Sequence, residues 1–204
     1  MRGTFRLGAE ISPAVTPFVE VAYGKTWRDE AVDVFGNDRS STDLRASVGA
    51  EINLSKKLNG EFSVGWLRQS FGSAGLGNIE GVALAAALNW SPQQGTIISA
   101  GLTTNAEPAN SATVSGSLVY GGTLGITHQL SSRFSTSANF GASYRDFTGT
   151  GGNDTTLSAE LAATYWVNRM LGVNAKARYE TVSSSDPLRE SDTTTLLLGL
   201  KIQR

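Results

Sequence analysis

The sequence predicts an all-β fold, namely an antiparallel up-and-down β-barrel that crosses a membrane with about twelve strands. Three observations predict this fold. Apolar and polar residues alternate along the chain, so that in residues 44–54 every even position is apolar and every odd position is polar or glycine. The alternating segments are about twice as long as the strands of water-soluble proteins. The connections between these segments alternate between short and long.

Eleven segments show this alternation, which places successive side chains on opposite faces of a sheet. They are residues 3–12, 17–28, 42–55, 59–71, 79–91, 95–105, 112–130, 133–147, 155–167, 171–183 and 192–203. A tilted strand needs about 9 to 11 residues to cross a bilayer, and the typical segment is long enough. We therefore expect residues 1–204 to form a single β-barrel domain, or the C-terminal part of a longer barrel.

Each segment is recognised by the residues that share one face. The outward face carries Phe5, Leu7, Ala9 and Ile11 in the first segment, and Val19, Val21, Tyr23 and Trp27 in the second. It carries Leu44, Val48 and Ile52 in the third segment, Phe62 in the fourth and Trp90 in the fifth. The sixth segment is marked by the inward Gly101. The outward face carries His128 in the seventh segment, Phe134 and Tyr144 in the eighth, and Tyr165 in the ninth. It carries Val173, Ala175, Ala177 and Tyr179 in the tenth segment and Ile202 in the last. One apolar and one polar face are therefore expected along the whole sheet.

The connections differ in length between the two ends of the strands. The short ones are residues 12–16, 55–58, 91–94, 131–133 and 168–170, and the longer ones include residues 29–41, 72–78, 105–111, 148–154 and 184–191. Short turns at one end and longer loops at the other are typical of outer-membrane barrels, in which the turns face the periplasm. A water-soluble meander has no reason to sort its loops in this way.

Aromatic residues of the outward face gather near both ends of the segments. Phe5, Trp27, Tyr144 and Tyr179 lie toward the loops, whereas Phe62, Trp90, Phe134 and Tyr165 lie toward the turns. Such a distribution predicts two aromatic girdles at the membrane interfaces. Trp66 and Phe140 lie nearer the middle and do not contribute to this pattern.

Charged residues also divide between the two faces. A lysine or arginine that faces lipid costs about 2 to 4 kcal/mol at the bilayer midplane and little near an interface. The outward charges Lys25, Arg68 and Glu80 lie at the loop ends of their segments. The inward charges, which we expect to line an aqueous lumen, are Arg6, Glu10, Glu20, Arg45, Glu51, Glu61, Arg145, Glu160, Lys176, Arg178 and Glu180.

Composition excludes several classes of function. The chain has 17 Lys and Arg against 18 Asp and Glu, so we expect no nucleic-acid partner. It has no cysteine, which excludes zinc ribbons and thiol catalysis. The single histidine, His128, has outward parity near a turn, which favours a solvated interfacial residue over a catalytic base. We therefore expect no enzyme activity, no catalytic residue, no metal and no cofactor.

These features resemble the outer-membrane β-barrel proteins of Gram-negative bacteria, in particular the putative β-barrel porin group. The resemblance covers the whole chain as a pattern of hairpins and is carried by stretches such as residues 44–52 and 196–202. The last segment is similar to the assembly signal of that class at Gly199 and Ile202, whereas Arg204 stands where the class has an aromatic residue. The resemblance implies the outer membrane of a Gram-negative bacterium as the location. It also implies outer-membrane lipid, lipopolysaccharide and the barrel-assembly machinery as partners.

The number of segments bears on how the sheet closes. Bacterial single-chain barrels have an even number of strands, and eleven is odd. Residues 1–12 also carry Arg6 and Glu10 where a secretory signal would be apolar. We therefore expect that the chain either lacks its first strand or is a fragment of a longer barrel. A chain that closes alone would form a barrel of about twelve strands, and one cut from a larger barrel would form an incomplete, curved sheet.

Small inward side chains and inward charges of both signs predict a passive channel for small hydrophilic solutes. One alternative is a structural or adhesive outer-membrane barrel with a plugged lumen. Another is an autotransporter-type translocator, which would need a helix or a passenger before the first strand. The sequence leaves open whether the protein forms a homo-oligomer.

Overall fold

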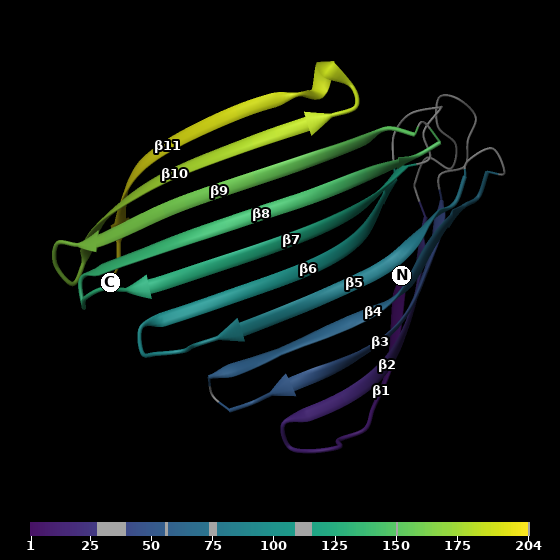
Figure 1. Ribbon diagram of the computed structural model, residues 1–204, viewed down its shortest axis with the longest axis horizontal. Helices are drawn as coiled ribbons and strands as arrows, with labels where there is room; N and C mark the ends of the chain where they lie inside the picture. The colour runs from purple at the N-terminus through teal and green to yellow at the C-terminus, as the bar shows by residue number, and fades with distance from the viewer. Residues whose placement is uncertain (28–39, 56, 74–76, 109–115, 150, 204) are drawn as a thin grey trace.

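The computed structural model describes residues 1–27, 40–55, 57–73, 77–108, 116–149 and 151–203. They form one sheet in which eleven strands follow each other in chain order, each antiparallel to the next (Figure 1). The strands are β1 (Arg2–Gly8), β2 (Val15–Thr26), β3 (Ser41–Asn53), β4 (Leu58–Phe71), β5 (Ile79–Trp90), β6 (Thr96–Pro108), β7 (Gly116–Gln129), β8 (Phe134–Thr148), β9 (Asn153–Trp166), β10 (Leu171–Ser184) and β11 (Ser191–Ile202). A single 3-10 turn, η1 (Pro187–Arg189), joins the last two strands. In the described parts of the chain, no helix is long and apolar enough to cross a membrane.

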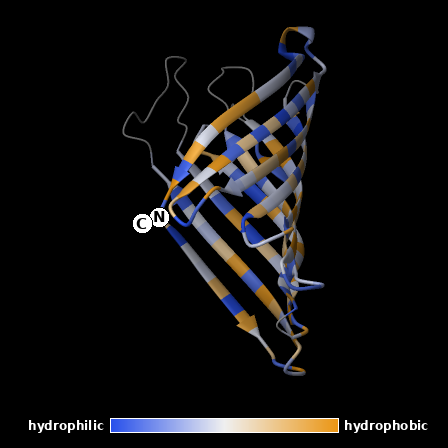
Figure 2. Ribbon diagram, turned by 90° about the vertical axis from the view of Figure 1, so that its left-hand side faces the viewer, coloured by the Kyte–Doolittle hydropathy of each residue, from blue (hydrophilic) through white to orange (hydrophobic). Residues whose placement is uncertain are grey.

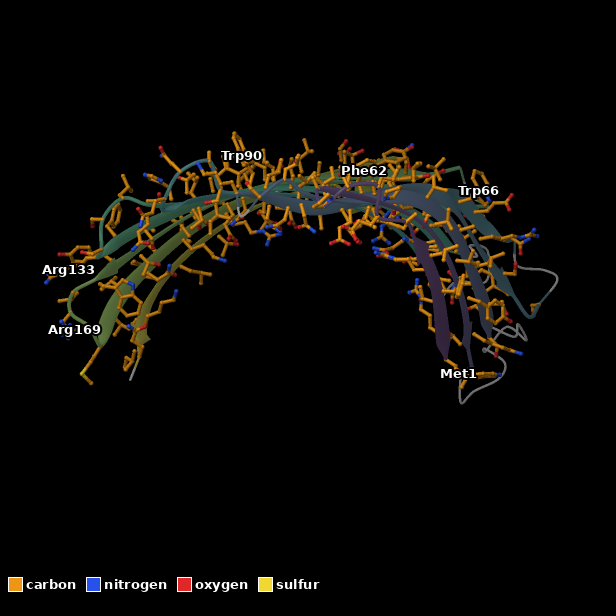
Figure 3. All side chains as sticks on the ribbon, turned by 90° about the horizontal axis from the view of Figure 1, so that it is seen from below. Met1, Phe62, Trp66, Trp90, Arg133 and Arg169 are labelled. Atoms are coloured by element: carbon orange, nitrogen blue, oxygen red, sulfur yellow. The ribbon has the colours of Figure 1, made fainter. Side chains whose placement is uncertain are left out.

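The sheet is strongly curved, like part of a barrel wall (Figure 3). Phe62, Trp66 and Trp90 lie on the convex side, so the odd-numbered residues of β4 and β5 face the concave side (Figure 3). Residues that pair across neighbouring strands share a face, and the continuous register extends this assignment to all eleven strands. Figure 2 shows the resulting alternation of apolar and polar residues along the strands.

The predicted all-β, up-and-down antiparallel fold is confirmed, and the strand positions agree closely with the predicted segments. The sheet is not closed, because within the described residues β1 pairs with β2 alone and β11 pairs with β10 alone. It therefore takes the second of the two predicted forms, an incomplete curved sheet. Parts of the expected loops at 29–41, 72–78 and 105–111, and the start of the segment predicted at 112–130, lie outside the described residues.

The apolar face is the outer surface of the sheet rather than a buried core. Val48 is 56% exposed and Leu161 is 61% exposed, and Leu44 is also exposed. A water-soluble sandwich would bury these side chains, so the outward side requires an apolar environment. The prediction that the Leu44–Val48 side does not form a compact core is confirmed.

The short turns are closed by side chains near their start. Asn168 Oδ1 accepts hydrogen bonds of 2.8 Å from the backbone N–H groups of Met170 and Leu171. Ser131 Oγ similarly accepts from the N–H of Phe134, at 3.1 Å. Such local acceptors replace backbone partners and stabilise a tight reversal of the chain.

The first strand is shorter than predicted, and this difference corrects one site residue. The segment predicted at 3–12 ends as a strand at Gly8. Ala9 still donates its N–H to the carbonyl of Pro17 at 3.0 Å, but proline has no N–H to return to Ala9, so the ladder stops there. Glu10 therefore lies outside the strands, next to the turn, instead of in the wall.

One part of the sheet buries apolar side chains. Leu67, Ile79, Ala83 and Leu118 form a buried apolar cluster near the loop end of β4, β5 and β7. The pairing of β5 with β6 covers only Ala85–Trp90 and Ile98–Thr103, although both strands continue toward the loops.

Candidate lumen-lining face

The concave face carries all the predicted lumen charges except Glu10. By register these are Arg6 on β1, Glu20 on β2, Arg45 and Glu51 on β3, Glu61 on β4, Arg145 on β8, Glu160 on β9, and Lys176, Arg178 and Glu180 on β10. Strand alternation alone puts them on this face, because each lies at the parity opposite to the exposed large apolar residues of its strand.

Arg6 forms the centre of a cluster near the first edge of the sheet. Its Nε lies 2.7 Å from Glu20 Oε2, and its Nη1 lies 2.9 Å from Glu61 Oε2. The guanidinium also stacks over the Phe18 ring, 4.0 Å from the centroid. Phe18 is buried because it lies against Gly49, where a Cβ would come within 2.6 Å of Phe18 Cζ. The cluster joins three strands and fixes a cation between two carboxylates.

A second group of charges lies on β9 and β10. Lys176 Nζ lies 2.9 Å from Glu160 Oε2, and Arg178 Nη2 lies 2.5 Å from Glu180 Oε2. Beside them is a hollow of about 280 Å³, whose lining includes the small or polar residues Ser99, Thr123, Gly125, Asn139, Ser158 and Glu160. Small residues keep this part of the wall thin, because a Cβ at Gly125 would lie 2.7 Å from Ser99 Oγ.

Arg145 and Glu107 form a third pair, closer to the loops. Arg145 Nη1 lies 2.8 Å from Glu107 Oε2 and donates to Ser117 Oγ at 3.3 Å. Glu107 was missed by the sequence prediction, which placed it in a loop after a segment that ended at residue 105. The continued alternation of Thr103, Asn105 and Glu107 is the signal that could have identified it.

The two predicted charges of β3 differ in the range of their contacts. Arg45 donates from its guanidinium to the backbone carbonyl of Thr104 on β6. Glu51 accepts a 3.0 Å hydrogen bond from Asn53 Nδ2. Arg45 is therefore engaged with the backbone of a distant strand, which the sequence pattern did not indicate.

The convex charges lie near the strand ends, as the sequence predicts. Lys25 lies over the Trp27 ring, 5.4 Å from its centroid, and Arg68 Nε lies 3.8 Å from Glu80 Oε2. His128 Nδ1 lies 2.8 Å from Thr96 Oγ1 near a short turn. In the described part of the chain, no group of three or more His, Cys, Asp or Glu residues could hold a metal ion.

The residues of the expected assembly signal lie in β11 at the second edge of the sheet. Gly199 pairs with Asn174 and Ile202 pairs with Leu171. Ile202 is 80% exposed on the convex side, and a Cβ at Gly199 would meet no atom within 4 Å. Their role in assembly stays a prediction.

Comparison with known proteins gives one family and several structures of similar fold. Residues 1–204 match the model of the family described as "Putative beta-barrel porin 2". The outer membrane channel DcaP of Acinetobacter baumannii superposes with a TM-score of 0.61 at 11% identity, covering 97% of this chain and 60% of DcaP. The chain therefore spans about three fifths of the length of that channel.

Two further structures have the same kind of fold. A loop L8 deletion mutant of OmpT, an outer membrane protein of Vibrio cholerae, gives a TM-score of 0.53 at 10% identity and covers 98% of this chain and 89% of OmpT. The FrpB iron transporter from Neisseria meningitidis gives 0.56 at 9% identity, covering 96% of this chain and 39% of FrpB. No curated protein matches the chain. At these identities the structural likeness establishes the fold of an outer-membrane β-barrel wall.

Proposed function

The chain belongs to the family described as "Putative beta-barrel porin 2" and is an outer-membrane protein of a Gram-negative bacterium, and from this we propose that it forms a passive channel for small hydrophilic solutes. The observation that carries the proposal is the separation of the two faces of one sheet. The convex face is apolar and exposed, whereas the concave face holds ion pairs and small polar residues.

The concave face supports passage of solutes rather than chemistry on them. Arg6, Lys176 and Arg145 are each paired with carboxylates of other strands, so they are held along the wall. Ion pairs along an aqueous passage orient water and dipolar solutes without binding one tightly. We propose that the protein has no enzymatic activity, because its one histidine lies on the convex side beside Thr96, away from these charges.

Planar-bilayer recording tests the proposal. Protein purified from outer membranes should give discrete steps of current, and its permeability to cations relative to anions follows from the reversal potential in a salt gradient. Absence of discrete steps from correctly inserted protein would reject the channel.

A matched set of variants excludes a contaminating channel. Lys176→Gln should shift the selectivity toward cations and Glu160→Gln toward anions, because each leaves its partner's charge uncompensated in the lumen. The double variant restores the balance and should return close to the wild type. Selectivity that does not follow these changes would mean that the recorded current comes from another protein.

A further inference from the structure

The ladder between β5 and β6 stops in the middle of both strands. The last pair toward the loops is Ala85 with Thr103, yet β5 begins six residues earlier at Ile79 and β6 continues to Pro108. The pairing of β6 with β7 is uninterrupted as far as Pro108 and Gly116. The loop end of the β6–β7 hairpin, residues 104–108 and 116–120, therefore leaves β5 as a unit. Figure 1 shows β6 curving away from β5 toward β7 in this region.

The register shows where this hairpin end lies. Ile79 has concave parity on β5, and Leu118 has convex parity on β7. Side chains on opposite faces of a single-layered sheet cannot touch. Ile79 and Leu118 nevertheless belong to one buried cluster, in which they are 0% and 6% exposed. The convex side of the hairpin end must therefore be packed on the concave side of β4 and β5.

Glycines permit this close approach. A Cβ at Gly81 would lie 2.4 Å from Leu118 Cδ2, and a Cβ at Gly116 would lie 2.5 Å from Ile79 Cδ1. Both distances are shorter than van der Waals contact, so the two layers come together at the positions that have no side chain.

Polar contacts hold the second layer in place. Thr104 Oγ1 accepts a 2.9 Å hydrogen bond from the N–H of Leu84, and the carbonyl of Thr104 accepts from the guanidinium of Arg45. Arg45 lies on β3, three strands away from β6 in the sheet order. Neighbouring strands are about 4.8 Å apart, so a contact between the Arg45 side chain and the backbone of β6 agrees with a β6 end that lies over the concave face.

We infer that the loop end of the β6–β7 hairpin is a fixed second layer that narrows the passage, and that Arg45 is a positioning residue for it. Packed sheets lie about 10 Å apart, so the second layer reduces the free width of the lumen by about that distance. Glu107 lies on the side of the hairpin end that remains open to the passage and pairs with Arg145 of β8, so this pair sets which solutes pass the narrowing. The inference that the hairpin end narrows a solute path rests on the proposed channel function, whereas the inferred position of the hairpin end does not.

Disulfide cross-linking tests the position, and the absence of native cysteine gives a clean background. The pair Gly81→Cys with Leu118→Cys should link under mild oxidation, because these positions face each other across the two layers. In a single-layer wall the β5–β6 register would continue and place Gly81 beside Glu107, so the pair Gly81→Cys with Glu107→Cys should link instead. Ala85→Cys with Thr103→Cys, which are partners in the existing ladder, shows that the sheet has assembled.

We expect the 81–118 pair to shift in mobility on a non-reducing gel, with the shift lost on reduction, and the 81–107 pair to show no shift. Linking of 81–107, with or without 81–118, would overturn the fixed second layer. Failure of both while the 85–103 control links would also overturn it. None of these outcomes depends on whether the protein conducts.

Conductance tests the narrowing. Arg45→Gln combined with Leu118→Asn should release the hairpin end and raise single-channel conductance by about twofold, because a layer about 10 Å deep no longer fills the lumen. For cross-linking, Arg45→Gln is combined with Gly81→Cys and Leu118→Cys. This triple variant should no longer form the 81–118 link. Lys25→Gln removes a charge on the convex face and should leave conductance and cross-linking unchanged. If the protein with Arg45→Gln and Leu118→Asn has the same single-channel conductance as the wild type, the inferred narrowing is wrong, whereas the proposed channel function is unaffected. Arg45→Lys keeps a donor and should retain the link.

Discussion

Leu118 and Leu124 lie on the same strand and on the same face, but their surroundings differ. Leu124 is 42% exposed on the single-layered part of the sheet, whereas Leu118 is 6% exposed where β7 covers β4 and β5. Alternation along a strand determines which face a side chain takes. It does not determine whether lipid or protein covers that face. The comparison therefore separates the turn-end half of β5–β7, which is a membrane wall, from the loop-end half, which contains a small core.

The largest difference should appear on truncation of the two leucines. Leu118→Ala should destabilise the protein by about 2 to 5 kcal/mol, because it leaves a cavity in a packed cluster. Leu124→Ala should cost clearly less, since lipid chains fill the space beside the wall. Urea unfolding in lipid vesicles, followed by tryptophan fluorescence, measures both. Equal losses would mean that both leucines face lipid.

Introducing a charge tests the single-layered half. Leu124→Arg should destabilise the protein by about 2 to 4 kcal/mol if it lies near the bilayer midplane, because the arginine would face lipid. The neighbouring Thr123→Arg faces the concave side and should change stability little. The same unfolding measurement applies, and a similar loss from both variants would contradict the assignment of the two faces.

Removal of a concave charge should alter conduction more than stability. Arg6 is partly exposed and paired with Glu20 and Glu61, so Arg6→Gln should cost about 0.2 to 1 kcal/mol after solvent screening. The two remaining carboxylates should make the passage more selective for cations. A reversal potential that does not move would mean that this cluster does not face the conducting path.

The smallest effect is expected for the convex pair at the loop end. Arg68 and Glu80 are 3.8 Å apart and about half exposed, so Arg68→Ala should change stability by less than about 1 kcal/mol. Added salt should reduce even that difference. A larger loss, independent of salt, would indicate that this position lies within the hydrocarbon region.

The wall could be predicted from the sequence because its signal is local. A period of two fixes the face of each residue, and the sorted connections fix strand order, so most concave charges, such as Glu61 and Lys176, were found. Glu10 was misplaced because the alternation through Ile11 continues past the point where Pro17 ends the ladder. Alternation reports side-chain polarity and not the availability of an N–H.

The second layer could not be predicted because its causes are distant in the chain. Leu118 has the same parity and chemistry as Leu124, and Gly81 is one glycine among 23. Contact between Leu118 and Gly81 depends on the break in the β5–β6 ladder, and no residue next to the break indicates it in the sequence. The link between Arg45 and Thr104 spans 59 positions and was hidden for the same reason.

The pairing of the concave charges affects how an ion experiences the wall. Each fixed cation on Arg6, Lys176 and Arg145 has a carboxylate within 3 Å, so its field decays as that of a dipole rather than of a single charge. An ion travelling down the middle therefore meets a nearly level potential, whereas one that moves close to the strands crosses alternating attractive and repulsive patches. Discrimination by sign is then strongest wherever the path is forced against the wall.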